Sequence, residues 1–437
     1  MPSYRQNQLL ARVNFPLYTV HSLSERHILV AGGGGGAKTG IHNVIEIYEL
    51  INNGRTCRAQ SVTHFKTGNE AIMNCTIFNN QKYFILFAGK EGNCQVYKMK
   101  HEIVEDEICT SNSVKETDVQ STVRKRVPST GSGVEDVPLR NDTSVAKESD
   151  SNANDIHKLL RFNIQPLESF QTDFSDDPFQ KQVKFSSLSK VLASAGSDGH
   201  IRLWKFPKLN QIHDIEAHND DVDDLDICPR GEMIVSVSRD GHGKIWSIKD
   251  GSLITELKYS LPSNCDSKYI FRSCRFGLTE NTNEFTLFTT LNPAVRKRPP
   301  AKSYICKWDT KQFSLQKMVS AGSDMLSVMA ISDNGHFIGL GTQDGSVKMY
   351  IAFSLQLVYN IDRVHSIFVT GLEFLPSSDE SRRITGGHEA SLISISVDNH
   401  IIIHHIPMRG SMGMLSLITL FVLTLFFVFV VMDYFNL

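Results

Sequence analysis

The sequence has no paired cysteines, no strong net charge and none of the common catalytic signatures. Its eight cysteines stand singly, without a Cys-x-x-Cys spacing, which argues against a zinc site and fits reduced thiols in a protein core. The formal net charge of −2 excludes a global field that would attract nucleic acid. Neither Gly-x-Ser-x-Gly nor His-Glu-x-x-His occurs, so we expect no covalent chemistry and no enzyme.

A signal-peptide pattern is also missing from residues 1–8, yet the opposite end of the chain carries a long apolar run. Residues 412–432 are 21 residues without a charge, dominated by Leu, Phe and Val. At about 1.5 Å per residue, such a helix spans the hydrocarbon core of about 30 Å. Arg409 precedes the run and Asp433 follows it. The positive-inside rule therefore predicts a transmembrane helix at 412–432, a cytosolic body and a short lumenal tail at 433–437.

The body of the chain repeats with a period of about 42 residues. Residues 192–204 and 234–246 each contain an apolar strand, an Asp-Gly turn and a second strand ending in tryptophan. Trp204 and Trp246 lie 42 residues apart, as do Trp308 and Tyr350. This period and content predict an all-β, seven-bladed, WD-repeat-like β-propeller.

The predicted blades occupy residues 14–50, 58–100, 160–206, 207–249, 250–310, 311–352 and 353–407. Two blades thus fall within residues 1–100 and five within 159–408. The fifth unit is long, because 62 residues separate Trp246 from Trp308, so we expect an extra projecting loop. Ring closure should pair a strand from one terminus with the blade of the other, since an unpaired sheet edge invites aggregation. His218 and His365 stand where such repeats carry a structural histidine, and we interpret both as structural.

Residues 101–158 interrupt the repeat. They contain no Phe, Tyr or Trp and carry 12 acidic against 7 basic side chains. Such a segment cannot bury enough apolar surface to offset the entropy of ordering it. We therefore expect a disordered acidic insertion between blades two and three.

The most unusual stretch is a run of five glycines near the N-terminus. Gly32, Gly33, Gly34, Gly35 and Gly36 follow an apolar strand, and a second strand follows at residues 44–48. Glycine destabilises a folded chain unless φ must be positive or another group approaches closely, so this run predicts a functional loop. Residues 32–39 miss the phosphate-loop pattern by one residue, but no helix follows to hold a phosphate.

Several stretches of the chain resemble a known protein family. They are residues 31–43 with this glycine run, the preceding Phe15, Pro16, Leu17 and Tyr18, and residues 167–178, 273–277 and 350–356. Joined to WD-like repeats and a C-terminal anchor, they resemble the family of endoplasmic-reticulum membrane exchange factors for Sar-type small GTPases. The likeness covers nearly the whole chain except residues 101–158.

The resemblance implies a guanine-nucleotide exchange factor whose propeller lies in the cytosol. It would promote GDP release from the Sar-type GTPase at the endoplasmic reticulum, initiating assembly of the COPII vesicle coat and transport to the Golgi. By the same resemblance, Gly32 to Gly36 would form a loop organised by a potassium ion. Ile41 and Asn43 would be the side chains that enter the GTPase.

Two other functions remain open at this stage. The chain could be a membrane-tethered WD-repeat scaffold without exchange activity, in which the glycine loop is a peptide-binding rim. It could also be a DNA-binding protein of the transcription type, but this requires a basic face. The net charge of −2 and the apolar run at 412–432 argue against DNA binding.

Overall fold

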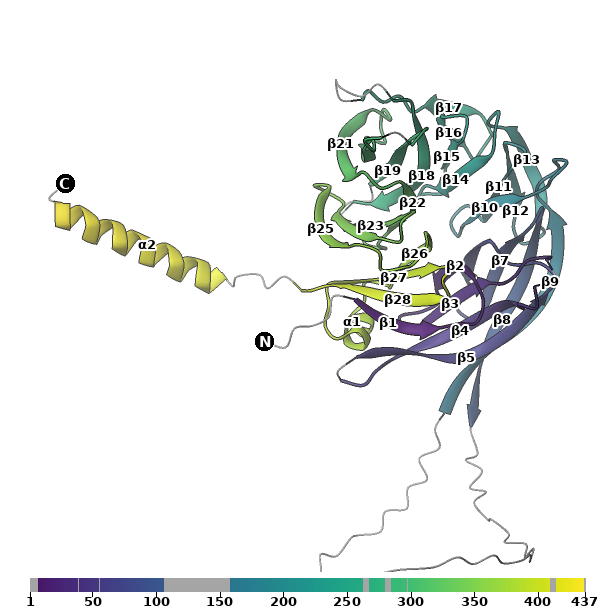
Figure 1. Ribbon diagram of the computed structural model, residues 1–437, viewed down its shortest axis with the longest axis horizontal. Helices are drawn as coiled ribbons and strands as arrows, with labels where there is room; N and C mark the ends of the chain where they lie inside the picture. The colour runs from purple at the N-terminus through teal and green to yellow at the C-terminus, as the bar shows by residue number, and fades with distance from the viewer. Residues whose placement is uncertain are drawn as a thin grey trace, which may run out of the picture. The chain divides into compact units, whose positions relative to one another are not determined.

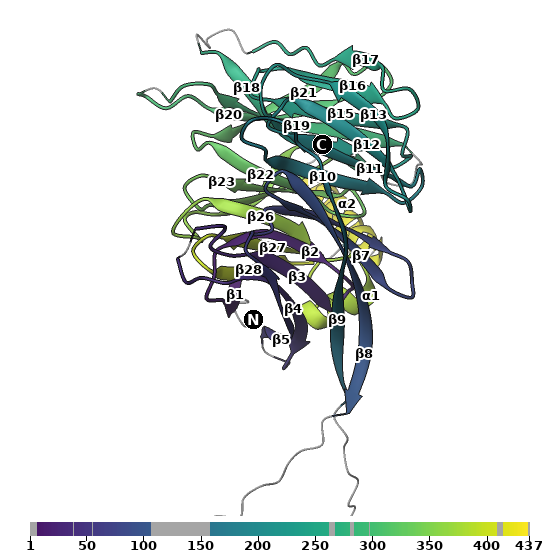
Figure 2. The same ribbon diagram turned by 90° about the vertical axis from the view of Figure 1, so that its right-hand side faces the viewer.

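The computed structural model describes residues 7–37, 39–54, 56–105, 158–261, 267–279, 284–296, 298–408 and 414–435. Seven four-stranded antiparallel sheets form within these residues (Figures 1 and 2). Their first strands are neighbours in the order β2, β6, β10, β14, β18, β22, β26, and β26 contacts β2 again. The predicted all-β propeller of seven blades is confirmed.

The first four sheets are formed by strands from residues 17 to 256. Sheet one contains β2 (Leu17–Ser22), β3 (His27–Gly32), β4 (Asn43–Asn52) and β5 (Cys57–Gly68). Sheet two contains β6 (Asn74–Asn79), β7 (Phe84–Lys90), β8 (Asn93–Glu105) and β9 (Lys158–Gln171). Sheet three contains β10 (Gln180–Ser186), β11 (Val191–Gly196), β12 (His200–Lys205) and β13 (Asn210–Glu216). Sheet four contains β14 (Val222–Ile227), β15 (Met233–Ser238), β16 (Gly243–Ser247) and β17 (Leu253–Glu256).

The last three sheets complete the ring. Sheet five contains β18 (Tyr269–Leu278), β19 (Phe285–Pro293), β20 (Ser303–Trp308) and β21 (Leu315–Gly322). Sheet six contains β22 (Leu326–Ile331), β23 (Phe337–Thr342), β24 (Val347–Ile351) and β25 (Gln356–Ile361). Sheet seven contains β26 (Val369–Phe374), β27 (Ala390–Ser396), β28 (His400–Ile406) and the N-terminal strand β1 (Asn7–Arg12). A short helix, α1 (Asp379–Thr385), lies between β26 and β27.

Ring closure joins the two ends of the propeller sequence. Strand β1 pairs antiparallel with β28, with Asn7 opposite His404 and Leu9 opposite Ile402. The prediction that a terminal strand closes the ring is therefore correct.

The repeat units predicted from the sequence and the observed sheets differ by one strand. The predicted units end with or just after a third strand, such as β12 with Trp204, whereas the fourth strand belongs to the same sheet. Strand β13 therefore completes sheet three, although the predicted units assign it to the next blade. The fourth strand was missed because the repeat signals lie on strands two and three, while β13 is largely exposed. In sheet five, the excess length is shared by long strands β18 and β19 and the connections around them.

The acidic insertion lies at a different place from the one expected. Strands β8 and β9 flank it, and both belong to sheet two. It is therefore an insertion within blade two, between its third and fourth strands, rather than between blades two and three. The repeat pattern did not show where the insertion begins and ends, because strands β8 and β9 extend beyond the predicted repeat units. Residues 106–157, to which the prediction of disorder mainly applies, lie outside the described residues.

The Asp-Gly turns of the repeat require glycine. Gly199 has φ +76°, and a Cβ there would lie 2.2 Å from the carbonyl oxygen of His218. The His218 ring is held between Asp240 Oδ2, 2.9 Å from Nδ1, and Ser236 Oγ, 2.8 Å from Nε2. Trp246 Nε1 donates to the same Ser236 hydroxyl at 2.9 Å. His218 thus ties the strands of its blade together, which confirms its structural role.

His365 has an equivalent position in blade seven. Its ring lies 3.1 Å from Asp398 Oδ1 and 2.7 Å from Ser394 Oγ, so its structural role is also confirmed. The cysteines that the structure describes are free and buried, as expected for small core residues: Cys57, Cys75, Cys94, Cys228, Cys274 and Cys306. Cys109 and Cys265 lie outside the described residues.

The C-terminal apolar run forms helix α2 (Met414–Phe435). From residue 418 to 432, its large apolar side chains are exposed to solvent. Among the residues that the structure describes, no helix meets the length and apolarity needed to cross a membrane.

We predict that acid weakens the propeller through His404. This buried ring meets Tyr359 Oη at 2.7 Å and Ser394 Oγ at 2.8 Å, and burial lowers its pKa to about 3. As the pH falls below 6.5, the unfolded chain binds a proton that the folded chain excludes, so the free energy of unfolding decreases. At pH 5 this histidine should cost about 2 kcal/mol.

Urea unfolding at pH 7 and pH 5 measures this loss. His404→Gln should reduce the difference between the two pH values, whereas His42→Gln, at an exposed position, should leave it unchanged. An equal loss in wild type and His404→Gln would show that other groups carry the acid sensitivity.

Candidate functional site

The glycine run forms the connection between strands β3 and β4. Strand β3 is buried along its whole length and ends at Gly32, which pairs with Val44 of β4. The loop is therefore residues 33–42, between the second and third strands of sheet one. We call it the glycine loop. Lys38 lies outside the described residues.

The first three glycines are required by close packing. A Cβ on Gly32 would lie 1.9 Å from Pro16 O, and one on Gly33 would lie 2.5 Å from Asn43 Cα. A Cβ on Gly34 would lie 2.4 Å from Thr39 Oγ1. These distances are far below van der Waals contact. Gly32 therefore packs on Pro16, Gly33 on the start of β4 and Gly34 on the second half of the loop. Gly35 has open space around it but φ +70°, a conformation that favours glycine.

The side-chain amide of Asn43 holds the glycine loop by hydrogen bonds. Its Oδ1 accepts a hydrogen bond from Gly35 N at 2.9 Å. Its Nδ2 donates to Gly35 O at 3.2 Å and to Gly68 O at 3.1 Å. The side chain is buried, with 4% of the residue exposed. The resemblance implied that Asn43 enters a partner, but here its amide is directed inward, because residue 43 begins β4 opposite Gly68. In this conformation Asn43 positions the loop.

Ile41 is the apolar side chain that the loop presents. It is 39% exposed, and its N–H faces Thr39 Oγ1 at 3.4 Å. Gly40 precedes it with φ +78°, so the chain turns immediately before Ile41. Burying an exposed isoleucine against a partner would contribute favourable free energy without any charge. Contact between Ile41 and a partner stays a prediction.

The residues of the loop fit a monovalent cation by donor type. Its possible ligands are backbone carbonyl oxygens of Gly32 to Gly36, of which that of Gly35 already accepts a bond from Asn43. In the described part of the chain, no group of three or more His, Cys, Asp or Glu residues could hold a metal. Neutral carbonyls suit a weakly charged ion better than calcium, which prefers carboxylates, and the Glu91 carboxylate approaches the loop at Gly36.

Blade two supplies the neighbouring surface. The turn between β7 and β8 reaches the glycine loop, since a Cβ on Gly36 would lie 3.5 Å from Glu91 Oε1. Gly92 O in that turn accepts bonds from the backbone N–H groups of Thr172 and Asp173 at 2.9 and 3.1 Å. The glycine loop, the turn and the segment after β9 thus form one continuous rim.

Phe174 is the exposed apolar side chain on this rim. It is 57% exposed and stacks on the Arg202 guanidinium at 4.7 Å. Burial of the neighbouring Asp173 carboxyl opposes its ionisation, but hydrogen bonds from Ser175 and Ser197 outweigh burial and lower its pKa. Sequence reasoning did not select these residues as functional, although the stretch 167–178 carries part of the resemblance.

Comparison with known proteins gives information on the family of this chain as well as on its fold. The WD domain, G-beta repeat family matches residues 174–205 and 209–247. The chain is 33% identical over 423 residues to the guanine nucleotide-exchange factor SEC12 of Mus musculus, covering 95% of this chain and 94% of that protein. The SEC12 of Rattus norvegicus is 32% identical over 420 residues, with coverage of 95% and 94%. SEC12-like protein 1 of Arabidopsis thaliana is 29% identical over 200 residues, covering 45% and 46%.

The chain belongs to the SEC12 family. The mammalian SEC12 is the prolactin regulatory element-binding protein, so the resemblance carried by the glycine run is confirmed. The assignment does not depend on the propeller alone, because the WD repeat matches only two segments while the SEC12 match spans nearly the whole chain. Propellers host many functions, and the full-length match is therefore the more informative one.

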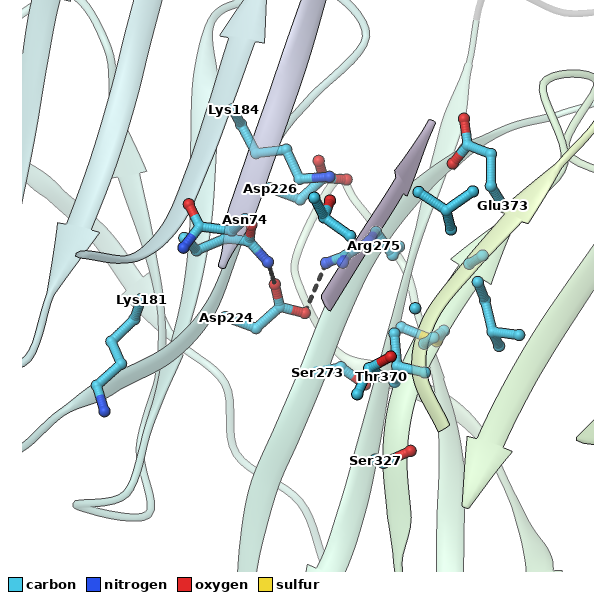
Figure 3. A pocket seen from close by; sticks show the side chains of 18 of the residues that line it. Asn74, Lys181, Lys184, Asp224, Asp226, Ser273, Arg275, Ser327, Thr370 and Glu373 are labelled. Atoms are coloured by element: carbon cyan, nitrogen blue, oxygen red, sulfur yellow. Dashed lines mark hydrogen bonds and ion pairs between the residues drawn. The ribbon is translucent and has the colours of Figure 1, made fainter. Parts of the chain in front are cut away.

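A polar cavity of this SEC12-family chain lies on the first strands of several sheets and has a volume of about 470 Å³ (Figure 3). Within it, Arg275 Nη1 donates to Asp224 Oδ2 at 2.6 Å, and Gln182 Nε2 donates to Asp224 Oδ1 at 2.9 Å. Asp226 accepts from Phe276 N at 2.8 Å, and burial raises its pKa. These bonds join sheets three, four and five, so we interpret the network as structural.

We predict that Gly33→Ala opens the glycine loop. Its new Cβ would collide with the Asn43 backbone, which has no room to move within β4, so the Asn43–Gly35 clasp should break. Hydrogen–deuterium exchange of the full-length chain should then be faster in peptides covering residues 33–43. Gly36→Ala is the matched control, because the nearest atom lies 3.5 Å from its Cβ. Equal protection in wild type and Gly33→Ala would refute the clasp.

Proposed function

We propose that this chain is a guanine-nucleotide exchange factor that promotes GDP release from a Sar-type small GTPase. The glycine loop is the element that contacts the GTPase. The observation that carries the proposal is a loop held by the Asn43 amide and presenting Ile41, in a chain whose full-length relatives are named guanine nucleotide-exchange factors.

Exchange requires no bond to be made or broken in the GTPase. It requires a surface that binds the nucleotide-free form more tightly than the nucleotide-bound form, because only differential affinity shifts an equilibrium. Changing the ratio of two states from 1:99 to 99:1 requires that a partner bind one state about 5.5 kcal/mol more tightly than the other. Complete burial of one isoleucine supplies only about 1.5–3 kcal/mol. Ile41 therefore acts together with the loop backbone and with the rim of blade two.

Asn43 acts through the loop rather than on the nucleotide. With its amide bonded to Gly35 and Gly68, the loop is ordered before the partner arrives. A preordered loop loses less conformational entropy on binding, and this increases affinity without new contacts. A potassium ion on the carbonyls of Gly32 to Gly36 would restrict the same loop further. Our proposal therefore gives Ile41 a contact role and Asn43 a positioning role.

We predict that Ile41→Ala slows GDP release about tenfold, since a loss of about 1.4 kcal/mol of transition-state binding corresponds to a factor of ten. Asn43→Ala should slow it further while leaving the propeller folded, because it removes the clasp. Tryptophan fluorescence of a purified Sar-type GTPase in stopped flow measures the rate. Measuring the rate of GDP release in sodium instead of potassium buffer tests whether a potassium ion organises the loop.

Ile51→Ala is the matched control. Ile51 has the same side chain and nearly the same exposure, 40%, but lies at the other end of β4. Its replacement should leave GDP release unchanged. Wild-type rates from folded Ile41→Ala and Asn43→Ala would refute the glycine loop as the exchange element, and no acceleration by wild type would refute exchange activity itself.

We further propose that residues 412–432 anchor the chain in the endoplasmic-reticulum membrane, with the propeller in the cytosol. There, GTP loading of the Sar-type GTPase would initiate COPII coat assembly and transport to the Golgi. Support comes from the 21 uncharged residues of the run, from Arg409 before it and from Asp433 after it. The family resemblance supports the compartment and the coat.

We predict that Leu423→Arg combined with Phe427→Arg releases the chain from membranes. Each charge at the centre of a spanning helix costs about 2.5–3.5 kcal/mol on insertion scales. Alkaline carbonate extraction of cells expressing the chain should leave wild type in the pellet and the variant in the supernatant. Leu423→Ala with Phe427→Ala is the control and should stay in the pellet. Extraction of wild type by carbonate would contradict the anchor.

A further inference from the structure

Two lysines face each other across neighbouring strands of blade five. Lys307 in β20 lies directly opposite Lys317 in β21 in the strand register. Like charges directly opposite on adjacent strands destabilise a sheet. Nearby contacts must therefore compensate for the repulsion between the two lysine charges.

Both ammonium groups reach the next blade. Lys307 Nζ donates to Phe353 O at 3.0 Å, and Lys317 Nζ donates to Ser354 O at 3.0 Å. These carbonyls belong to the turn between β24 and β25. Neither lysine has a carboxylate partner among the described residues, whereas Lys311 in the same hairpin pairs with Glu284 at 3.5 Å. Burial lowers the pKa of Lys307, and the Lys317 charge adds to this effect.

A groove with apolar and polar lining residues begins beside Lys307. It is a cavity of about 390 Å³ between blades five and six, lined by Leu278, Phe288, Ile351, Ala352 and Phe353 beside Lys307. Phe288 is buried in the groove, while Phe353 is 83% exposed, and its ring centroid lies 5.0 Å from Lys307 Nζ. An almost fully exposed phenylalanine next to two ammonium groups that bond only backbone carbonyls is a feature of a binding surface.

The groove and the glycine loop lie on opposite faces of the ring. The glycine loop connects the second and third strands of its blade. The groove, in contrast, is lined where first strands lead to second strands, by Leu278, Thr279 and Thr286 and by Gly335 and His336, and where a third strand leads to a fourth, by Ala352 and Phe353. Because strands alternate in direction within each blade, these two kinds of connection emerge on opposite faces. A ligand in the groove would leave the glycine loop accessible.

We propose that this groove binds an extended segment of a partner protein in which a carboxylate stands next to a bulky apolar side chain. The carboxylate would bond the Lys307–Lys317 pair, and the apolar side chain would enter the cavity between Leu278 and Phe353. Charge complementarity favours a carboxylate on the bound segment, because neither lysine ammonium group has a carboxylate partner in the described part of the chain. The concave shape selects a peptide over a flat membrane surface. Glu389, which also lines the cavity, would repel an acid inside it, so the carboxylate belongs at the lysine pair and the apolar side chain in the cavity.

The test uses the full-length chain in detergent and a fluorescein-labelled synthetic peptide with leucine and phenylalanine between glutamates. Fluorescence anisotropy should show saturable binding that weakens with salt. The same peptide with glutamine for glutamate should bind at least tenfold more weakly. Lys317→Gln and Phe353→Ser should each weaken binding of the acidic peptide about tenfold. Both side chains are exposed, so both variants should fold.

Lys311→Gln is the matched control and should bind like wild type, because its lysine pairs with Glu284. Equal binding of the acidic and neutral peptides, or unchanged binding by Lys317→Gln, would overturn the proposal. Absence of saturable binding by the acidic peptide would also overturn it. GDP release is not part of this test, so the result is independent of the exchange proposal.

Discussion

Closure of the ring by β1 on β28 is the constraint on which the rest of the structure depends. A four-stranded sheet with an open edge presents unpaired N–H and C=O groups, and here the N-terminal strand covers the edge of the last sheet. Once the ring is closed, each blade packs against two neighbours through its apolar faces. The connections between strands are then held at defined positions on two faces, although they contain little regular structure themselves.

The glycine loop shows how packing and one side-chain amide can restrict a segment rich in glycine. Glycine alone increases backbone freedom, and a run of five would normally be a flexible linker. In this chain, close packing of Gly32, Gly33 and Gly34 and the Asn43 amide remove that freedom. Gly36 and Gly40, in contrast, are exposed, so this part of the loop backbone stays accessible to a partner. Restriction and accessibility, which usually oppose each other, are thus combined in one loop.

The two faces of the propeller present different chemistry. The rim around the glycine loop offers backbone groups, Ile41 and Phe174. The opposite face offers the Lys307–Lys317 pair and the groove beside Phe353. Because strand direction decides which connection emerges on which face, a propeller can carry two binding surfaces that do not compete for the same space. This arrangement is suited to a protein that activates a GTPase while it is attached to another component.

The repeat, the number of blades, the structural histidines and the glycine loop could be predicted from the sequence, because each depends on short-range patterns. Asp-Gly turns, alternating apolar residues and aromatic strand ends lie within about ten residues of one another, and they determine local conformation directly. Only the tertiary structure decided that Asn43 points inward, that β13 completes blade three and that the insertion lies within blade two. It also decided that Lys307 and Lys317 face each other beside Phe353. These features depend on strand register and on contacts between blades, which join residues distant in the sequence and therefore leave no local pattern.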